Sequence, residues 1–174
     1  MSFEQFSTER LAVQDWTREL ANSTSRRGLE KALRPILADR VLKHLPPPLH
    51  LSAAEDGVSG WVNARADESD VFVVRKNDNG AVIGLLILAK MDATEKVTGV
   101  HFGYLFAEEY WGHGYATELI RGFIGEMESQ GPALLIGGVD KTNMASASVL
   151  RKAGFKCDPG MSTPDTEIFV YPAN

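Results

Sequence analysis

Hydrophobic and polar residues follow two different periods along the chain, and each period predicts its own set of elements. Between residues 16 and 45 leucine or valine recurs at four-residue spacing among many charged positions, which is typical of helix. Gly28 and Pro35 fall inside this span, so it holds either one helix or two or three shorter ones. The proline-rich segment that follows ends it. Residues 9–13 alternate and predict a short first strand.

The middle of the chain follows the two-residue period of β-strands. Residues 71–75 and 81–88 are apolar runs, and the Asn79-Gly80 pair between them is a strong hairpin signal. A third run covers residues 97–106 after a polar turn at residues 91–96. We therefore expect an antiparallel meander here, preceded by an irregular or partly helical connection.

The second half of the chain alternates between helix and strand patterns. Residues 115–130 form the clearest amphipathic helix, and Gly131-Pro132 ends it. Residues 133–139 predict a buried strand, and a helix with cap-type residues at its start runs to Ala153. Residues 167–171 alternate and predict a last strand.

These elements predict one domain over residues 1–174 of the α/β (α+β) class, with a mixed, mostly antiparallel central sheet flanked by helices. A chain of 174 residues with 44% hydrophobic and 24% charged residues is long enough to bury a sizeable single core. Its 18 basic and 23 acidic residues give a net charge of −5, which argues against nucleic acid or an anionic membrane as partner.

The cysteine content and the apolar runs also indicate which disulfides, metal sites and cellular compartment to expect. The single Cys157 excludes an internal disulfide and a multi-cysteine zinc site, so no metal is expected. With no evident base partner, we expect its thiol to be buried as a small hydrophobe. The first residues lack a basic region followed by an apolar run, and no stretch reaches membrane-spanning length, so we expect a cytoplasmic protein.

Two glycines lead directly into the amphipathic helix. Gly112 and Gly114 let several backbone N–H groups approach an anion, and the helix dipole adds to the attraction. The loop therefore predicts a phosphate site. A dinucleotide fingerprint would need a third glycine where Thr117 stands and a βαβ context in place of the meander. A nucleotide-binding module is accordingly the less favoured interpretation.

Three segments form one combined motif: Gly103-Tyr104, residues 111–118, and residues 143–155 with Asn143, Ala145-Ser146, Val149-Leu150, Lys152 and Gly154-Phe155. Together they resemble the GNAT superfamily of N-acetyltransferases, most closely its RimJ/RimL-type ribosomal-protein branch. With the strands between them, the resemblance covers roughly residues 70–157. It implies acetyl-CoA as cofactor and direct acetyl transfer to a primary amine, on a protein N-terminus or a small molecule.

The resemblance also implies which residues hold CoA. The pyrophosphate is expected on the loop Trp111, Gly112, His113, Gly114, Tyr115, Ala116 and Thr117, where Trp111 replaces the usual Gln or Arg. The pantetheine arm is expected to pair like an added strand with Tyr104, Leu105 and Phe106. Asn143 either caps the last helix, bonds a pantetheine amide, or does both.

The chemistry requires a neutral amine, a stabilised oxyanion and a proton for the departing thiolate. His101 occupies a position where RimJ/RimL-type sequences often carry Glu, and it is either the general base or a packed strand histidine. Leu150 stands where many members have a proton-donating Tyr. Ser146 matches a Ser common in the RimJ/RimL-type branch, so it is either the thiolate's partner or an ordinary helix-start residue. A backbone N–H near Leu105 is expected to bind the oxyanion.

Departures from the usual Glu and Tyr leave a second hypothesis, a CoA-binding regulator without turnover. The histidines at positions 44 and 50 flank the proline-rich segment, and we expect both on the surface with no tie to the chemistry. Phe102, Tyr104 and Phe106 alternate and are expected to face the core. A homodimer is compatible with the sequence.

Overall fold

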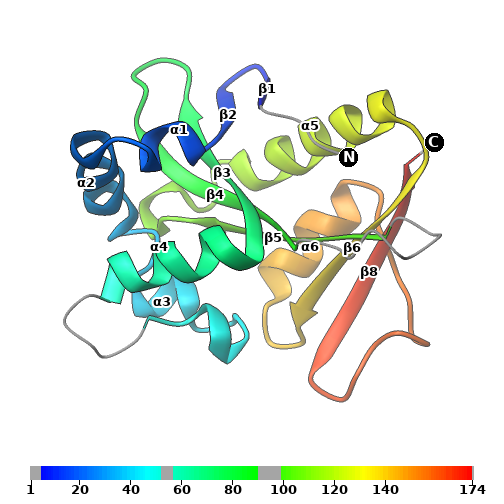
Figure 1. Ribbon diagram of the computed structural model, residues 1–174. Coiled ribbons are helices and arrows are strands. Elements are labelled where there is room, and N and C mark those ends of the chain that lie inside the picture. The colour runs from blue at the N-terminus through cyan, green and yellow to red at the C-terminus, as the bar shows by residue number, and fades with distance from the viewer. Residues whose placement is uncertain (1–4, 52–56, 90–98, 174) are drawn as a thin grey trace.

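The computed structural model describes residues 5–51, 57–89 and 99–173, and within them eight strands form one sheet (Figure 1). Their order across the sheet is β1-β2-β3-β4-β5-β6-β8-β7. Only β5 and β6 run parallel, and the other neighbours are antiparallel. The expected mixed, mostly antiparallel sheet is therefore confirmed. The strands are β1 Gln5–Ser7, β2 Leu11–Asp15, β3 Ser69–Lys76, β4 Val82–Ala89, β5 Gly99–Phe106, β6 Ala133–Asp140, β7 Lys156–Cys157 and β8 Thr166–Ala173.

Helices cover both faces of this sheet, as Figure 1 shows. They are α1 Thr17–Leu20, α2 Ser23–Leu33, α3 Asp39–Leu42, α4 Gly57–Glu68, α5 Tyr115–Gln130 and α6 Met144–Lys152, with short 3-10 turns η1 Pro47–Leu49 and η2 Glu108–Tyr110. The helical span after β2 is thus divided into three helices. Asn22 starts the second by accepting hydrogen bonds from the backbone N–H groups of Thr24 and Ser25, and Pro35 lies in the turn that follows it. Gly28 does not interrupt α2.

The central hairpin forms as its Asn-Gly turn predicts. β3 and β4 pair along their length, and Gly80 turns the chain with a φ of 69°, which favours glycine. The third strand of the meander, β5, is observed from Gly99. The polar turn expected at residues 91–96 lies outside the described residues.

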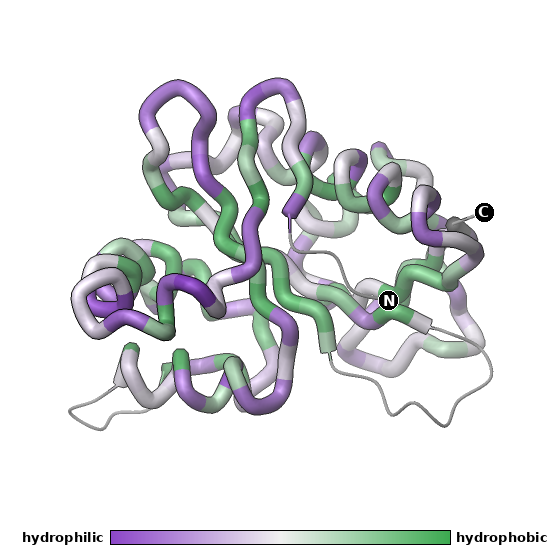
Figure 2. Tube along the Cα trace, turned by 45° about the horizontal axis from the view of Figure 1, so that its top comes forward, coloured by the Kyte–Doolittle hydropathy of each residue, from purple (hydrophilic) through white to green (hydrophobic). Residues whose placement is uncertain are grey.

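Each face of the sheet has its own hydrophobic core. α5 and α6 pack on one face, where Phe102 contacts the rings of Phe123 and Phe155 at centroid distances of 5.3 and 5.5 Å. α2, α3 and α4 pack on the other face, around Leu33 and Trp61. Figure 2 shows hydrophobic residues along the central strands and hydrophilic residues at the hairpin tips. The sheet therefore lies between two helical layers, each with its own core.

The strands β5 and β6 separate halfway along their length. Their parallel pairing runs from Gly99 and Leu134 to Phe102 and Gly137 and then ends. Beyond that point β5 stays paired with β4 as far as Phe106, while β6 stays paired with β8. One edge of residues 103–106 is consequently left without a neighbouring strand, which opens a gap in the sheet.

Cys157 does not occupy the buried position that we expected. It lies in β7, a two-residue strand at the edge of the sheet, and it is exposed, with its sulfur 3.9 Å from the Ser162 hydroxyl. The prediction of a buried thiol was therefore wrong. Both residues of this strand are exposed, so the thiol reaches solvent.

Candidate functional site

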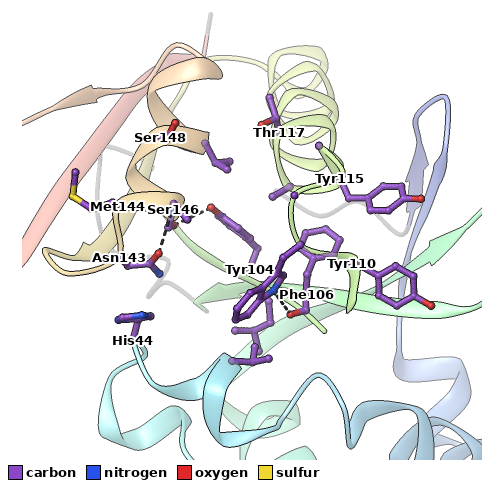
Figure 3. A pocket seen from close by; sticks show the side chains of 18 of the residues that line it. His44, Tyr104, Phe106, Tyr110, Tyr115, Thr117, Asn143, Met144, Ser146 and Ser148 are labelled. Carbon is purple, nitrogen blue, oxygen red and sulfur yellow. Dashed lines mark hydrogen bonds between the residues drawn. The ribbon is translucent and has the colours of Figure 1, made fainter. Parts of the chain in front are cut away.

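A cavity of about 630 Å³ lies where β5 and β6 part. Four segments of the chain contribute its walls: the region of α3, the end of β5, the loop that begins α5, and the start of α6 with the residues before it (Figure 3). The lining residues are Arg40, Val41, His44, Leu45, Tyr104, Leu105, Phe106, Tyr110, Trp111, Gly112, Gly114, Tyr115, Ala116, Thr117, Thr142, Asn143, Met144, Ala145, Ser146, Ser148, Val149 and Lys152.

Most of the residues expected to hold CoA line this one cavity. The strand residues Tyr104 to Phe106, Asn143 and the loop from Trp111 to Thr117 all contribute, except His113. His113 is exposed, and its backbone carbonyl accepts a hydrogen bond from Arg10. Its expected contact with phosphate stays a prediction.

The loop before α5 has the backbone that an anion site needs. Gly112 and Gly114 have φ values of 78° and 81°, in the left-handed region. Gly114 is the N-cap of the sixteen-residue helix α5, and it has no side chain to bond the first N–H groups. These N–H groups and the positive end of the helix dipole therefore face the cavity without an internal cap.

Arg10 ties the β1–β2 turn to this loop. Its guanidinium donates to the His113 carbonyl at 3.1 Å and to Glu118 at 2.6 Å, and it lies 4.5 Å from the centre of the Tyr115 ring. Burial alone would raise the pKa of Glu118, but hydrogen bonds from Thr8 and Arg10 outweigh it and lower this pKa below its usual value. The glycine loop is thus held by residues that sequence reasoning missed, since no local pattern joins positions so far apart.

Tyr104 and Ser146 meet inside the cavity. Their hydroxyl oxygens lie 2.9 Å apart and share a hydrogen bond (Figure 3). Burial raises the pKa of Tyr104 to about 12, so its hydroxyl keeps its proton at neutral pH. Asn143 caps α6 by accepting from the Ser146 N–H at 3.1 Å, which orients Ser146. The tyrosine expected to face the core is therefore half-buried, with its hydroxyl turned to the site.

Trp111 contacts the strand that it follows. Its indole N–H donates to the Phe106 carbonyl at 2.8 Å, and 45% of the residue is exposed. This hydrogen bond links the start of the glycine loop to the end of β5. Trp111 therefore makes a structural hydrogen bond at a position where the resemblance would place Gln or Arg.

The histidines are placed differently from expectation. His101 is exposed on β5 and does not line the cavity, so its role as general base stays a prediction. His44 follows α3 and does line the cavity, with 27% of its side chain exposed. Its Nδ1 lies 3.2 Å from the Thr142 hydroxyl and 3.9 Å from Asp140. His44 is therefore half-buried in the cavity wall, where we had expected an exposed surface residue.

The residues present fit a CoA molecule. The uncapped start of α5 suits a pyrophosphate, and the open edge of residues 103–106 suits the amides of a pantetheine arm. Both border the same cavity, which is of the size that binds small ligands.

Among the described helices, none combines the length and apolar character needed to cross a membrane.

Comparison with known proteins agrees with this geometry. Residues 19–156 match the sequence model of the acetyltransferase (GNAT) domain. No curated protein matches the chain. An acetyltransferase of the GNAT family from Bacillus anthracis has 18% identity over 97% of this chain and 98% of its own, with a TM-score of 0.75.

Two further solved structures share the fold. The ribosomal-protein-S5-alanine acetyltransferase from Vibrio fischeri has 17% identity over 98% of this chain and 97% of its own, with a TM-score of 0.64. The spermidine N-acetyltransferase from Vibrio cholerae, in complex with CoA and spermine, has 14% identity over 95% and 97%, with a TM-score of 0.70. Because the GNAT model spans most of the chain, this protein belongs to the GNAT family of acetyltransferases.

Proposed function

We propose that the protein transfers the acetyl group of acetyl-CoA directly to a primary amine, either a protein N-terminus or a small molecule, in the cytoplasm. One observation carries this proposal. A single cavity joins the open edge of β5 to the uncapped N-terminus of α5. This arrangement can bind the pantetheine arm and the pyrophosphate of one CoA molecule together.

The cofactor supplies an acetyl thioester. The loop from Trp111 to Thr117 holds the pyrophosphate, while Tyr104, Leu105, Phe106 and Asn143 hold the pantetheine arm. A backbone N–H of β5 near Leu105 stabilises the oxyanion that forms when the amine attacks the thioester carbonyl. A base of the protein takes the amine proton as the new C–N bond forms and the C–S bond breaks.

Ser146 and Tyr104 supply the proton that the departing sulfur needs. The Ser146 hydroxyl donates to the thiolate and draws a proton from Tyr104, with which it already shares a hydrogen bond. Burial raises the pKa of Tyr104 to about 12, so the tyrosine holds a proton at neutral pH that the pair can pass on. Solvent then restores the proton to Tyr104.

One observation favours the alternative of a CoA-binding regulator without turnover. Leu150, at the position where the resemblance would place a proton-donating Tyr, is 1% exposed and belongs to the core. The leucine therefore presents no proton donor to the cofactor from this position. The Tyr104–Ser146 pair supplies hydroxyls elsewhere in the cavity, and this makes turnover the better-supported function.

A ligand panel separates the candidate functions. We expect CoA and acetyl-CoA, but not NAD or ATP, to raise the melting temperature, since a ligand at 100 times its Kd stabilises a fold by about 2.7 kcal/mol. Thiol release is then measured with spermine, spermidine and short peptides with free N-termini. Release with any of them supports the enzyme. Binding of CoA without release from any acceptor would favour the regulator, and stabilisation by NAD alone would contradict both.

A further inference from the structure

His44 stands on the wall of the cavity opposite the glycine loop. In Figure 3 it lies on the same side as Asn143 and Ser146, while Tyr110 and Tyr115 lie on the other side. Its imidazole is linked to the loop after β6 through the hydrogen bond from Nδ1 to the Thr142 hydroxyl. A titratable side chain is thus held at the CoA cavity by residues 98 positions away in sequence.

The hydrogen bonds around Thr142 determine which imidazole nitrogen carries the proton. The Thr142 hydroxyl donates its only proton to Asp140 Oδ1 at 2.5 Å, and the Thr142 backbone N–H donates to the same oxygen at 2.8 Å. These two bonds lower the pKa of Asp140, so this carboxylate is ionised and only accepts. Thr142 Oγ must then accept from His44 Nδ1–H at 3.2 Å.

Neutral His44 therefore carries its lone pair on Nε2. Among the described residues, this nitrogen has no hydrogen-bond partner. A base needs an unprotonated nitrogen that a substrate can reach, and a neighbouring anion that stabilises the charge it acquires. His44 lines the cavity and its Nε2 is unprotonated, which meets the first condition, and Asp140, with Oδ1 3.9 Å from Nδ1, meets the second.

We propose that His44 is the general base of acetyl transfer, and that Thr142 and Asp140 are positioning residues that hold its imidazole in the reactive tautomer. His44 Nε2 takes the proton from the acceptor amine while the amine nitrogen bonds the acetyl carbon. The imidazolium returns this proton to solvent after the product leaves. This inference rests on the proposed acetyltransferase function and replaces His101 as the base.

The placement of the two histidines favours His44. His101 lies outside the cavity lining, on the stretch of β5 that is still paired with β6. His44 lies at the part of the cavity bordered by Asn143 and Ser146, where the thioester end of a pantetheine arm along the open edge of β5 would arrive.

Several charged groups share the surroundings of His44. Asp140 and Lys43 lie close enough to influence each other electrostatically, and Arg40 of α3 pairs with Glu108 of η2. Lys152 of α6 also borders the cavity. A change in the pH profile must therefore be assigned by comparing histidine variants under identical conditions, because these other groups are unaltered between them.

The test compares His44→Gln with the matched control His50→Gln. His50 does not line the cavity, and its Nε2 contacts the Leu45 carbonyl at 2.8 Å, a bond that glutamine can replace. For the amine that the wild type acetylates best, we expect His44→Gln to lower kcat/KM by about 10²- to 10⁴-fold, the usual contribution of a general base. Its activity should also lose the fall at acid pH, while the Kd for CoA stays unchanged.

Two further variants separate catalysis from a structural role. His44→Ala should regain activity when free imidazole is added, because the cavity admits a small base. Thr142→Val should lower kcat/KM by about three- to tenfold, the size of one lost hydrogen bond, and shift the pH profile. The ¹⁵N chemical shifts of His44 should report the Nδ1–H tautomer in the free wild-type protein, and this readout is independent of turnover.

The outcomes distinguish this inference from the function on which it rests. A wild-type protein that acetylates no amine contradicts the proposed function itself. An active wild type together with an active His44→Gln of unaltered pH profile overturns only the role of His44. The same holds if His101→Gln, and not His44→Gln, removes the fall at acid pH.

Discussion

The two walls of the cavity are built on different principles. One wall is the loop from Trp111 to Gly114 with the start of α5, and it offers the backbone N–H groups of the uncapped helix start. The opposite wall, from the region of α3 and the loop after β6, presents the side chains of Arg40, His44 and Asn143. The first wall depends on glycine conformations, and the second depends on hydrogen bonds between residues distant in sequence.

This difference matches two different tasks. A backbone site binds a constant anion, such as the pyrophosphate of CoA, whatever the side chains around it. A side-chain wall can select and deprotonate an acceptor, and it can vary without affecting the cofactor site. Changes in the glycine wall should therefore alter cofactor affinity, and changes in the side-chain wall should alter turnover.

After His44, the Tyr104–Ser146 pair gives the largest expected effect on turnover. Removing the donor in Ser146→Ala should lower kcat by about 10²-fold, the lower end for general acid catalysis, with little change in the Kd for CoA. Tyr104→Phe should give a smaller loss, and the double variant should lose less than the product of the two, because the hydroxyls act together. Steady-state kinetics and calorimetry check this. Fully multiplicative losses would mean that the two hydroxyls act separately.

A substitution that strains the backbone of the loop from Trp111 to Gly114 should weaken the binding of CoA. Gly114→Val places a β-branched residue at a φ of 81°, where strain amounts to about 1–3 kcal/mol, so we expect the affinity for CoA to fall about ten- to a hundredfold. Calorimetric titration with CoA measures this loss. The matched control is Gly125→Ala inside α5, where an added Cβ meets nothing within 4 Å and the helix should gain about 1 kcal/mol. Equal affinities in the two variants would contradict a backbone anion site.

Removing the Arg10 side chain should weaken CoA binding by the same loop to a smaller extent. Arg10→Ala removes its bonds to His113 and Glu118, but the pair is partly exposed and such pairs contribute about 0–1 kcal/mol. We therefore expect a loss of CoA affinity of up to about fivefold, with kcat unchanged once the enzyme is saturated. Kinetics at saturating acetyl-CoA test this division. A lower kcat at saturation would show that the β1–β2 turn also positions the reacting groups.

Acid pH should produce the smallest effect. The pKa of Glu118 is lower in the folded protein than in the unfolded chain, so its contribution to stability is present above the unfolded value and is lost as pH falls through the folded one. The wild type should accordingly lose more stability than Glu118→Gln on acidification below about pH 4.5. Urea unfolding of both proteins across this range measures the difference. Parallel curves would remove Glu118 from the acid response.

Sequence patterns predicted the elements in which local signals agree. The limits of α5 are those expected from its amphipathic face and the Gly131 stop, and the hairpin forms around Gly80. α4 was expected only as a partly helical connection, because Gly57 and Gly60 within it disfavour helix by about 1 kcal/mol each. β1 was missed because its three residues lie in the sheet only by pairing with β2.

The sequence by itself determined the glycine loop and its place at the start of an amphipathic helix. A glycine's φ and the start of an amphipathic helix depend on neighbouring residues, so the anion loop and its place before α5 are readable from the chain. Only the tertiary structure decided which side chains line the cavity. His44 meets Thr142 across 98 positions because the helices on one face of the sheet and the loop after β6 converge where β5 and β6 separate. No hydrophobic period within a short segment predicts this contact, because it arises from the packing of whole layers.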